Sequence, residues 1–532
     1  MPKTTRNREN SLPDSAIVIG AGIAGLATAG LLACRGVEVT IIDKLGSIGG
    51  RAGELNVDGF RWDTGPSWYL MPEAFDHFFE LMGTRAEDVY ELKKLDPAYR
   101  IYGPSGHRAD VRTGVNNVAE LFESLEPGAG QRVRDYLAQA TDAYRMALKH
   151  FLYTTFTVPL ALLHRDIRVR LGRLAELLLT DLQSYVSRRF EHPLLRQILS
   201  YPAVFLSTEP TRTPALYSLL NHTDLVDGVR YPQGGFAAVM RGIAKLVRDT
   251  GVHFELDCEA QEILTVPTGK RGKAQATGVR VRQDGASRVL RADAVISAAD
   301  LHHTETQLVP AHLQTYPERY WQRREPGLGT VLLLLGVEGE LPELAHHTFL
   351  FSDDWDPDFR AVFHGAGEPR RSQSIYVTRT SATDPTSAPE GSENLFVLVP
   401  VPPELKVGHG DAYRDAASAR VDEIAQATIR QIAGWTGISD LPDRVTVQRT
   451  LGPEDFAERY HAWAGGSIGP AHTLRQSAFL RGKNVSSHIT GLYYAGATTV
   501  PGVGVPMCLI SAENVLKRML DDASPAPLQP TF

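Results

Sequence analysis

The chain has 532 residues, which exceeds the size of roughly 250–300 residues at which a single hydrophobic core stops growing, so two or three domains are expected. A hydrophobic content of 43% and a charged content of 22% are ordinary for a globular protein and argue against a disordered chain. Because the formal net charge is −7, binding to nucleic acid is disfavoured.

In chain order, residues 1–14 are polar and lack periodicity, which predicts a flexible tail. Residues 15–43 follow the pattern strand, glycine-rich turn, helix, strand. Tight loops are expected at 49–51 and 63–67, where glycine, proline and small polar residues gather. Residues 71–220 show a mostly helical pattern with few strand signals, which predicts a helical insertion.

The second half of the chain returns to strand patterns after a turn at 231–235 and a helical stretch that reaches Arg248. The expected strands cover 252–264, 277–282, 288–299, 329–338, 373–379 and 394–400. A helix is expected from about 412 to 436. The chain should end with a strand at 491–497, then a glycine and proline loop at 498–506, and then a helix at 507–520.

The first strand–helix turn carries a dinucleotide-binding pattern. Gly20 permits the tight turn, Gly22 lets the backbone approach a pyrophosphate, and Gly25 lets the helix pack closely on the strand. The free amides at the helix start attract phosphate charge. Asp43 ends the second strand about 20 residues further on, as the pattern requires, and can accept hydrogen bonds from a ribose diol. The alternative is glycine-rich packing without a ligand.

The position of this motif at the start of the chain favours FAD over NAD, as does the sequence that follows it. Gly49, Gly50 and Arg51 come directly after the acidic strand end, and a guanidinium there can hold a phosphate through paired donors. A surface salt bridge is the alternative role for Arg51. An apolar run at 16–34 after basic residues imitates a secretory signal, but removing it would leave the strand at 37–42 without its partner.

Near the end of the chain, a loop rich in glycine and proline can lie against a flat ring. Gly496, Gly502 and Gly504 remove side chains from it, and Pro501 stiffens it. Pro506 falls where the last helix begins, so the helix dipole could face a flavin. An ordinary surface loop is the alternative.

Together these stretches resemble successive landmarks of bacterial phytoene desaturases and their carotenoid-oxidoreductase relatives. The matching stretches are 17–51, 63–67, 231–236, 466–481 (GSIGPAHTLRQSAFLR) and 492–512 (LYYAGATTVPGVGVPMCLISA), in the order of the family and across nearly the whole chain. The resemblance implies FAD contacts at Gly20, Gly22, Ile23, Ala24, Gly25, Asp43, Gly50, Arg51, Gly65, Pro66, Ala260, Gly496, Pro506 and Met507.

Three positions depart from the pattern of the family or of its wider relatives. Asp43 replaces the commoner Glu, which shortens the reach toward a ribose, and Ala497 stands where broader flavoprotein relatives often have Asp. Val500 stands where many relatives carry His, so that His cannot be an obligatory base in this chain. His303 and His461 are expected to be structural, and the sequence identifies neither a catalytic residue nor a metal site.

We therefore predict an α/β fold with a Rossmann-type FAD-binding domain of the two-dinucleotide flavoprotein type, a mixed-sheet substrate domain and a helical insertion. The FAD-binding domain is expected to combine 15–70, 231–305 and 485–532. The helical insertion would span 71–230 and the substrate domain 306–484.

The resemblance implies stepwise dehydrogenation of phytoene toward lycopene, with hydride transfer to the flavin and quinone or oxygen as possible final acceptor. Other carotenoid oxidoreductases remain open: an isomerase, a later-stage desaturase or an oxidase. A non-enzymatic lipid-group carrier of the GDP-dissociation-inhibitor type is the alternative from another class. Amine oxidation is disfavoured because no paired aromatic residues stand out for a cage at the flavin.

A hydrocarbon substrate resides in lipid, so a cytoplasmic enzyme attached peripherally to the membrane is expected; the cysteines, Cys34, Cys258 and Cys508, fit a reducing compartment. The segment 151–199 is the expected membrane contact, because apolar residues precede a group of arginines there. Those residues are Phe151, Leu152, Phe156, Val158, Leu160, Leu162 and Leu163, then Arg165, Arg168, Arg170 and Arg173. A core-packed helix pair with solvated arginines is the alternative.

Overall fold

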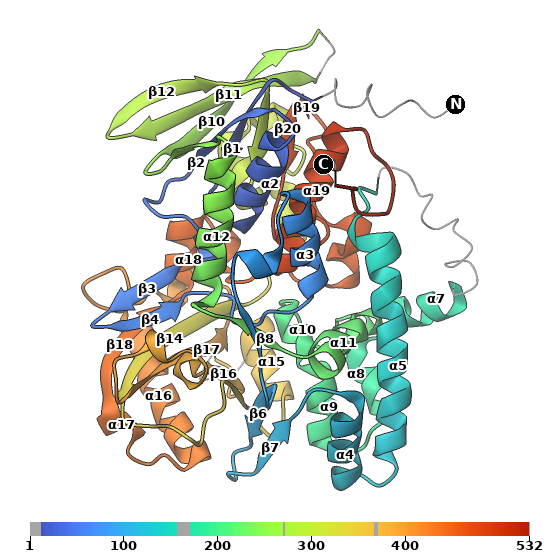
Figure 1. Ribbon diagram of the computed structural model, residues 1–532, viewed down its shortest axis with the longest axis vertical. Coiled ribbons are helices and arrows are strands. Elements are labelled where there is room, and N and C mark those ends of the chain that lie inside the picture. The colour runs from blue at the N-terminus through green and yellow to red at the C-terminus, as the bar shows by residue number, and fades with distance from the viewer. Residues whose placement is uncertain (1–11, 157–170, 270–271, 366–370, 531–532) are drawn as a thin grey trace.

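The computed structural model contains two large sheets, each with its own helices, arranged along the long axis of the molecule (Figure 1). The parallel sheet and its helices occupy the upper half of Figure 1, and the mixed sheet occupies the lower half. The structure describes residues 12–156, 171–269, 272–365 and 371–530. Most of the tail expected at 1–14 therefore lies outside the described residues.

Five parallel strands, drawn from three separate parts of the chain, form the upper sheet. In spatial order they are β20 (Leu492–Tyr494), β13 (Ala294–Ser297), β1 (Ser15–Ile19), β2 (Glu38–Ile42) and β9 (His253–Glu255). Ile17 on the central strand pairs with Val295 on one side and Thr40 on the other. Because parallel strands are buried on both faces, layers must cover this sheet on both sides.

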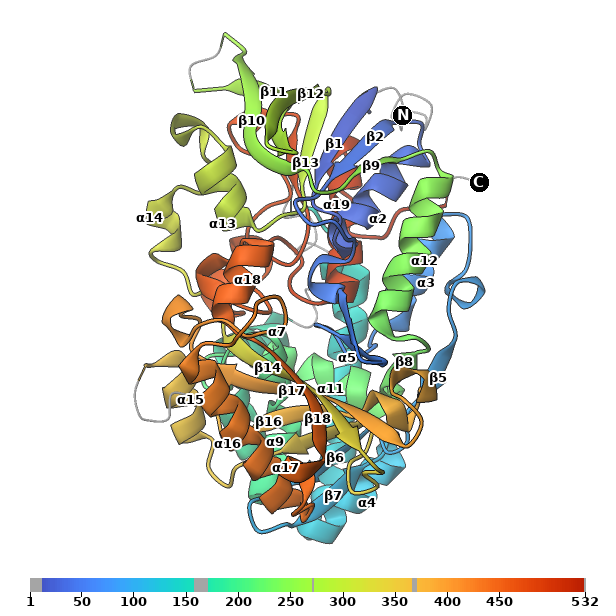
Figure 2. The same cartoon turned by 90° about the vertical axis from the view of Figure 1, so that its left-hand side faces the viewer.

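Helices cover one face of the parallel sheet, and a second sheet covers the other (Figure 2). The helices are α2 (Ile23–Ala33), α3 (Pro72–Leu81), α12 (Gly235–Asp249) and α19 (Val505–Met519). The second sheet comprises β10 (Glu259–Pro267), β11 (Ala274–Gln283), β12 (Ala286–Arg291) and β19 (Ile489–Thr490). Val18 packs among the helices, whereas Ile17 packs against the second sheet.

Two of the expected strands are wrong as single strands. The run 252–264 divides into β9 and β10, and Asp257 has a left-handed φ of 52° at the break. The run 288–299 divides into β12 and β13. In both cases the chain passes between the parallel sheet and the second sheet, and a continuous β pattern does not reveal a change of sheet.

The lower sheet has seven strands. In spatial order they are β18 (Val445–Leu451), β14 (Gly329–Glu338), β17 (Ser392–Val401), β16 (Ile375–Thr378), β15 (His347–Leu350), β6 (Tyr99–Tyr102) and β7 (Arg108–Val111). Only β15 and β6 pair in parallel within this sheet. The strand expected at 329–338 is confirmed.

One face of the seven-stranded sheet packs on α16 (Ala419–Thr436), where Leu333 meets Ile429 in one apolar cluster. This helix begins seven residues later than expected, because the backbone amides of Ala412 and Ser418 bond to Thr450 and His409 instead of continuing a helix. The opposite face packs on helices from the first half of the chain, namely α4 (Val115–Leu125), α5 (Ala129–Ala147), α8 (Leu182–Ser187) and α9 (Pro193–Ser200).

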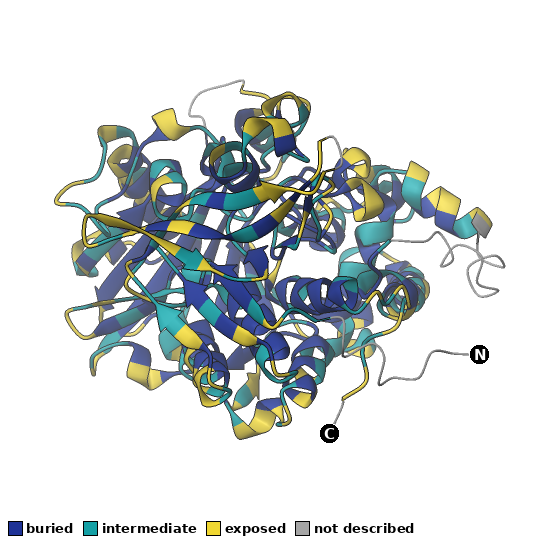
Figure 3. Cartoon of the chain, turned by 90° about the horizontal axis from the view of Figure 1, so that it is seen from above, coloured by how far each residue is buried: buried dark blue, intermediate teal, exposed yellow. Residues whose placement is uncertain are grey.

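The segment 71–220, expected to be mostly helical with few strand signals, also contains the short strands β6 and β7, which extend the lower sheet. Each has only four residues, too few for an alternating pattern to stand out. The domain limits drawn from the sequence stay a proposal. Seen from above, buried residues gather in the interior of the molecule, while the strands nearest the viewer also carry exposed residues (Figure 3).

Short elements complete the fold. Two antiparallel pairs join β3 (Glu54–Val57) with β4 (Phe60–Asp63), as a hairpin, and β5 (Leu92–Lys94) with β8 (Arg230–Pro232), which are far apart in the sequence. The remaining α-helices are α7 (Leu171–Leu179), α10 (Pro202–Phe205), α11 (Leu220–His222), α13 (Leu301–His303), α14 (Glu318–Trp321), α15 (Asp356–Phe363), α17 (Leu441–Arg444) and α18 (Pro453–Tyr460).

Candidate cofactor and substrate site

The carboxyl ends of the parallel strands meet at one edge of the upper sheet, which is where ligands bind in open α/β sheets. Gly20 follows β1, Asp43 follows β2, Ala298 follows β13, and Gly496 comes shortly after β20. A cavity of about 910 Å³ begins at this edge and is lined by all four residues. The same cavity continues to the seven-stranded sheet, so it joins the two halves of the molecule.

The glycines of the first turn serve two different purposes. A Cβ on Gly25 would lie 1.8 Å from the carbonyl oxygen of Gly20, so only glycine allows α2 to sit this close to β1. A Cβ on Gly22 would meet nothing nearer than the Gly49 carbonyl oxygen at 3.9 Å. The space in front of Gly22 is therefore part of the cavity, and the first turn of α2 directs its free amides toward it.

Asp43 connects the glycine-rich turn to the loop after β2. Its Oδ2 accepts a hydrogen bond from the Ala21 amide at 2.7 Å, and its Oδ1 accepts one from the Leu45 amide at 2.8 Å. Burial raises the pKa of this carboxyl, and the two amides oppose that rise. Each carboxylate oxygen keeps acceptor capacity for a ribose hydroxyl.

Arg51 supplies a cation to the same cavity. Its Nε is buried and has no hydrogen-bond partner among the residues that the structure describes. A Cβ on Gly65 would lie 2.0 Å from the Arg51 carbonyl oxygen, so Gly65 lets the two loops pack together. A buried unpaired donor requires a partner, and the phosphate of a dinucleotide fits this position.

The structure brings together nearly all of the residues that the sequence predicts to contact FAD. Those on the cavity wall are Gly20, Gly22, Ile23, Ala24, Asp43, Gly50, Arg51, Gly65, Pro66, Ala260, Gly496, Pro506 and Met507. Gly25 lies beneath the turn, where it determines the packing of α2, and is absent from the wall.

Several wall residues do not stand out in the sequence. Ala298, Ala299 and Asp300 line the cavity directly after β13, and their place at the end of a predicted strand was a usable signal. His303 and His461, expected to be structural, stack with ring centroids 3.7 Å apart and also line the cavity. Burial lowers the pKa of His303 to about 3 and that of His461 to about 4, so both rings are neutral at pH 7.

A buried polar network fixes the loop before α19. The Gly496 amide donates to Ser511 Oγ at 3.0 Å, and Asn484 Nδ2 donates to the Val500 carbonyl oxygen at 3.1 Å. Arg481 Nε donates to the Thr499 carbonyl oxygen at 3.0 Å. Within the described part of the chain, the Arg481 guanidinium bonds only to backbone carbonyls, and burial lowers its pKa to about 10. It therefore places a positive charge behind this loop.

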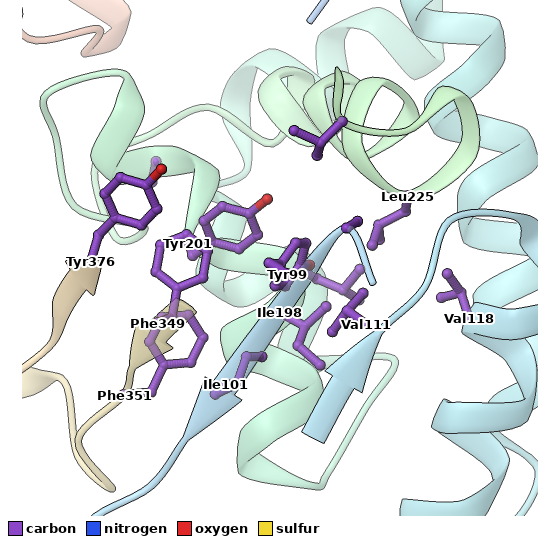
Figure 4. Close-up of a cluster of buried hydrophobic side chains, with 14 of the residues drawn as sticks. Tyr99, Ile101, Val111, Val118, Ile198, Tyr201, Leu225, Phe349, Phe351 and Tyr376 are labelled. Atoms are coloured by element: carbon purple, nitrogen blue, oxygen red, sulfur yellow. The ribbon is translucent and has the colours of Figure 1, made fainter. Parts of the chain in front are cut away.

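Beyond the loop the cavity wall becomes apolar and aromatic. Its members include Trp68, Leu70, Met71, Phe205, Leu206, Tyr201, Leu332, Tyr376, Phe396 and Leu398. Figure 4 shows Tyr201 and Tyr376 beside Phe349, in the core cluster between the helices and the lower sheet. Asp224 is the polar exception: Tyr201 donates to its Oδ2 at 2.5 Å, and burial raises its pKa to about 7.

Apolar residues at the surface mark one end of the cavity. Phe156 and Phe479, whose ring centroids lie 6.3 Å apart, both line it, as does Leu174 of α7. The side chains of Phe479 and Leu179 are unusually exposed for their type, at 63% and 79%. The cavity wall therefore reaches the protein surface at Phe479, and this end is called the mouth of the cavity.

Comparisons with known proteins agree with this architecture. A family profile described as flavin containing amine oxidoreductase matches residues 23–520. A carotenoid 3,4-desaturase from Haloarcula japonica is 39% identical over 505 residues, which cover 95% of this chain and 98% of that protein. A 4,4'-diapophytoene desaturase from Staphylococcus aureus is 31% identical over 510 residues, again covering 95% and 98%.

Among solved structures, cyclohexylamine oxidase from Brevibacterium oxydans aligns with a TM-score of 0.57 at 14% identity, covering 96% of this chain and 99% of that one. At this identity the likeness shows the shared fold. The chain therefore belongs to the flavin containing amine oxidoreductase family and is an FAD-dependent oxidoreductase. Within that family it belongs with the carotenoid desaturases. The predicted fold class and cofactor are confirmed, and the alternative of a non-enzymatic carrier is wrong.

The two kinds of glycine in the first turn give opposite mutational outcomes. We expect Gly22→Val to fold and to lose FAD, because its side chain would occupy the cavity where the pyrophosphate must approach. Gly25→Val should fail to fold, since its Cβ would collide with the Gly20 carbonyl oxygen. The soluble yield of both variants, together with flavin absorbance and thermal unfolding of purified Gly22→Val, measures the difference. Full FAD occupancy in folded Gly22→Val protein would contradict the assignment.

Asp224 should make stability depend on pH. Its folded-state pKa of about 7 lies above the unfolded value of about 3.9, so the folded protein binds this proton more tightly. The contribution is fully present below about pH 4 and is lost as the pH rises through about 7. Asp224→Asn should flatten this fall in the free energy of unfolding, by a few kcal/mol at most, as measured by denaturant unfolding across this pH range. Parallel curves for the two proteins would disprove the shift.

Proposed function

We propose that this carotenoid desaturase dehydrogenates phytoene stepwise toward lycopene. The observation that carries the proposal is the continuous cavity, which has phosphate and ribose partners at one end and an apolar chamber at the other. A hydrocarbon chain needs a dry, elongated, apolar space and few polar contacts. The apolar and aromatic wall residues described above, among them Trp68 and Leu398, offer such a surface.

Residues at one end of the cavity would hold the cofactor, and residues at the other end would hold the substrate. FAD, when bound, accepts the hydride that no amino-acid side chain can accept. Gly22, Asp43 and Arg51 would hold its pyrophosphate and ribose, while Ala260 lies on the wall at the same end. The loop before α19 would present backbone to the ring, because Gly504 has a φ of 106° and carries no side chain. The apolar wall excludes water and holds the substrate against that ring.

A later desaturation step is the second candidate. It is favoured by the 39% identity to the Haloarcula japonica carotenoid 3,4-desaturase, which exceeds the 31% identity to the diapophytoene desaturase. Both candidates use the same cavity and the same hydride acceptor. They differ in the carotenoid that the apolar chamber accepts first.

We further propose that the protein takes its substrate from a membrane surface and passes electrons to quinone or oxygen. Among the helices that the structure describes, none is both long and apolar enough to span a bilayer. The described candidates for contact with lipid are Phe479, which lines the cavity, and Leu179, which is exposed at the end of α7, the helix whose Leu174 and Leu178 line it. Residues 157–170, which include most of the expected apolar and arginine residues, lie outside the described part of the chain.

The choice between the two substrates is tested with liposomes. Purified FAD-loaded protein is incubated separately with vesicles that contain phytoene and with vesicles that contain lycopene, and the products are followed by absorption spectra. Phytoene desaturation predicts red-shifted products from the first and little change in the second. Conversion of lycopene alone would overturn the phytoene assignment in favour of the later step.

Membrane contact at the mouth gives a separate prediction. Phe479→Ser combined with Leu179→Ser should reduce co-flotation with anionic phospholipid vesicles, because each change removes exposed apolar surface beside the cavity. Val289→Ser is the matched control, since Val289 is also exposed, at 39%, but lies on β12, which contributes no residue to the cavity wall. Wild-type flotation of the double variant with an unchanged flavin spectrum would exclude these side chains as the contact.

A further inference from the structure

Desaturation removes a hydride from one carbon and a proton from its neighbour, so the site needs a proton acceptor as well as a flavin. His472 lines the cavity at the loop that precedes α19. Its side chain is only 3% exposed, and its Nε2 would lie 2.6 Å from a Cβ built on Gly502. Gly502 and Val503 line the same part of the wall. The absence of a side chain at Gly502 thus makes room for an imidazole beside the loop.

The surroundings of His472 determine which nitrogen carries the proton. Its Nδ1 lies 3.2 Å from the Leu206 carbonyl oxygen, which can only accept a hydrogen bond. Nδ1 must therefore be the protonated nitrogen in the neutral ring, which leaves the lone pair on Nε2. Nε2 is also the atom that lies next to Gly502, and both residues line the cavity, so the basic atom of the imidazole lies at the cavity wall.

Two neighbours fix the ring and its charge. The Tyr217 ring contacts the imidazole edge-on, with centroids 5.7 Å apart. The charged group that faces His472 is Arg481, and burial together with this cation lowers the pKa of His472 well below 6.5. Burial raises the pKa of Tyr217, which therefore stays neutral. The imidazole is then unprotonated at neutral pH and is held rigidly against the cavity.

We propose that His472 is the proton acceptor of the desaturation, a role that rests on the proposed function of the cavity. As a hydride leaves one carbon for FAD, the C–H bond on the neighbouring carbon breaks, its electron pair forms the new C=C bond, and its proton passes to Nε2 of His472. Two electrons go to FAD, and the imidazolium releases its proton afterwards. The carbon that loses hydride becomes strongly electron-deficient, so the neighbouring proton is acidic and a weak base suffices.

Asp224 is the competing base on the cavity wall. Its Oδ2 accepts the hydrogen bond from Tyr201, and its Oδ1 is buried without a partner among the described residues. It lies among the aromatic residues near the lower sheet, whereas His472 abuts the loop that leads into α19. The geometry favours His472, because the proton must leave from the carbon next to the one that faces the flavin.

The test uses FAD-loaded protein, carotenoid-containing liposomes and anaerobic rapid mixing, with the rate of flavin bleaching followed at several pH values. His472→Asn can keep a donor to the Leu206 carbonyl oxygen but places no atom at Nε2. We expect it to bind FAD normally and to slow bleaching on the order of 10²–10⁴-fold, the usual contribution of a general base. The wild-type rate should fall only at pH values well below 6.5, and this acid limb should disappear in the variant.

His409→Asn is the matched control, because the Nδ1 of His409 also lies near a backbone carbonyl oxygen, at 3.1 Å, but its ring is not part of the described cavity wall. It should bleach at the wild-type rate. If His472→Asn does not retain FAD, the bleaching experiment uses His472→Gln instead, which puts an amide near the Nε2 position. A ¹⁵N spectrum of the cofactor-free protein at neutral pH should show His472 protonated at Nδ1 alone.

Wild-type bleaching in folded, FAD-bound His472→Asn or His472→Gln protein would overturn the proposal. So would an acid limb near pH 7 that is lost in Asp224→Asn and kept in the His472 variants, since that result would assign the base to Asp224. Absence of bleaching in wild-type protein with every carotenoid tried would instead refute the proposed function. The failure of the base assignment is therefore distinguishable from the failure of the activity.

Discussion

The close contact between β1 and α2 is the constraint on which the site depends. Gly25 has no room for a Cβ because the Gly20 carbonyl oxygen occupies that position, so the helix start is pressed against the end of the central strand. This contact directs the first amides of α2 into the cavity. Asp43 bonds to the Ala21 amide and so ties β2 to the same turn. A change that loosened this contact would displace, at the same time, the residues proposed to hold the phosphate and the ribose.

The cavity changes from polar to apolar along its length, and the transition falls at the loop before α19. That loop is held from behind by Asn484, Ser511 and Arg481, which bond to backbone atoms of the loop, to one another and to the hydroxyl of Thr499. A guanidinium buried without a carboxylate is costly unless its donors are satisfied, and here the carbonyls satisfy them. The remaining positive charge lies behind the cavity wall, where a ring that gains negative charge would benefit from it.

The sequence predicts which residues gather at the carboxyl ends of the parallel strands, but it predicts the rest of the cavity wall poorly. The reason is physical. Gly20, Gly22 and Asp43 belong to one local strand–turn–helix unit, so their spacing along the chain already encodes their geometry. Leu332 and Tyr376 reach the wall only through sheet pairing between distant segments, and that pairing leaves no local pattern. The strands β6 and β7 leave no pattern for a different reason, since four residues each are too few to show an alternation.

His472 illustrates this limit at the level of chemistry. It lies within the stretch 466–481, which resembles the carotenoid oxidoreductases, yet no neighbouring residue in that stretch marks it as a base. The loop at 498–506 contains no histidine, carboxylate or other evident base. His472, which lies outside this loop in the sequence, places an imidazole beside it through its contact with Gly502. A proton acceptor can therefore be supplied to this loop by a residue that the loop motif does not contain.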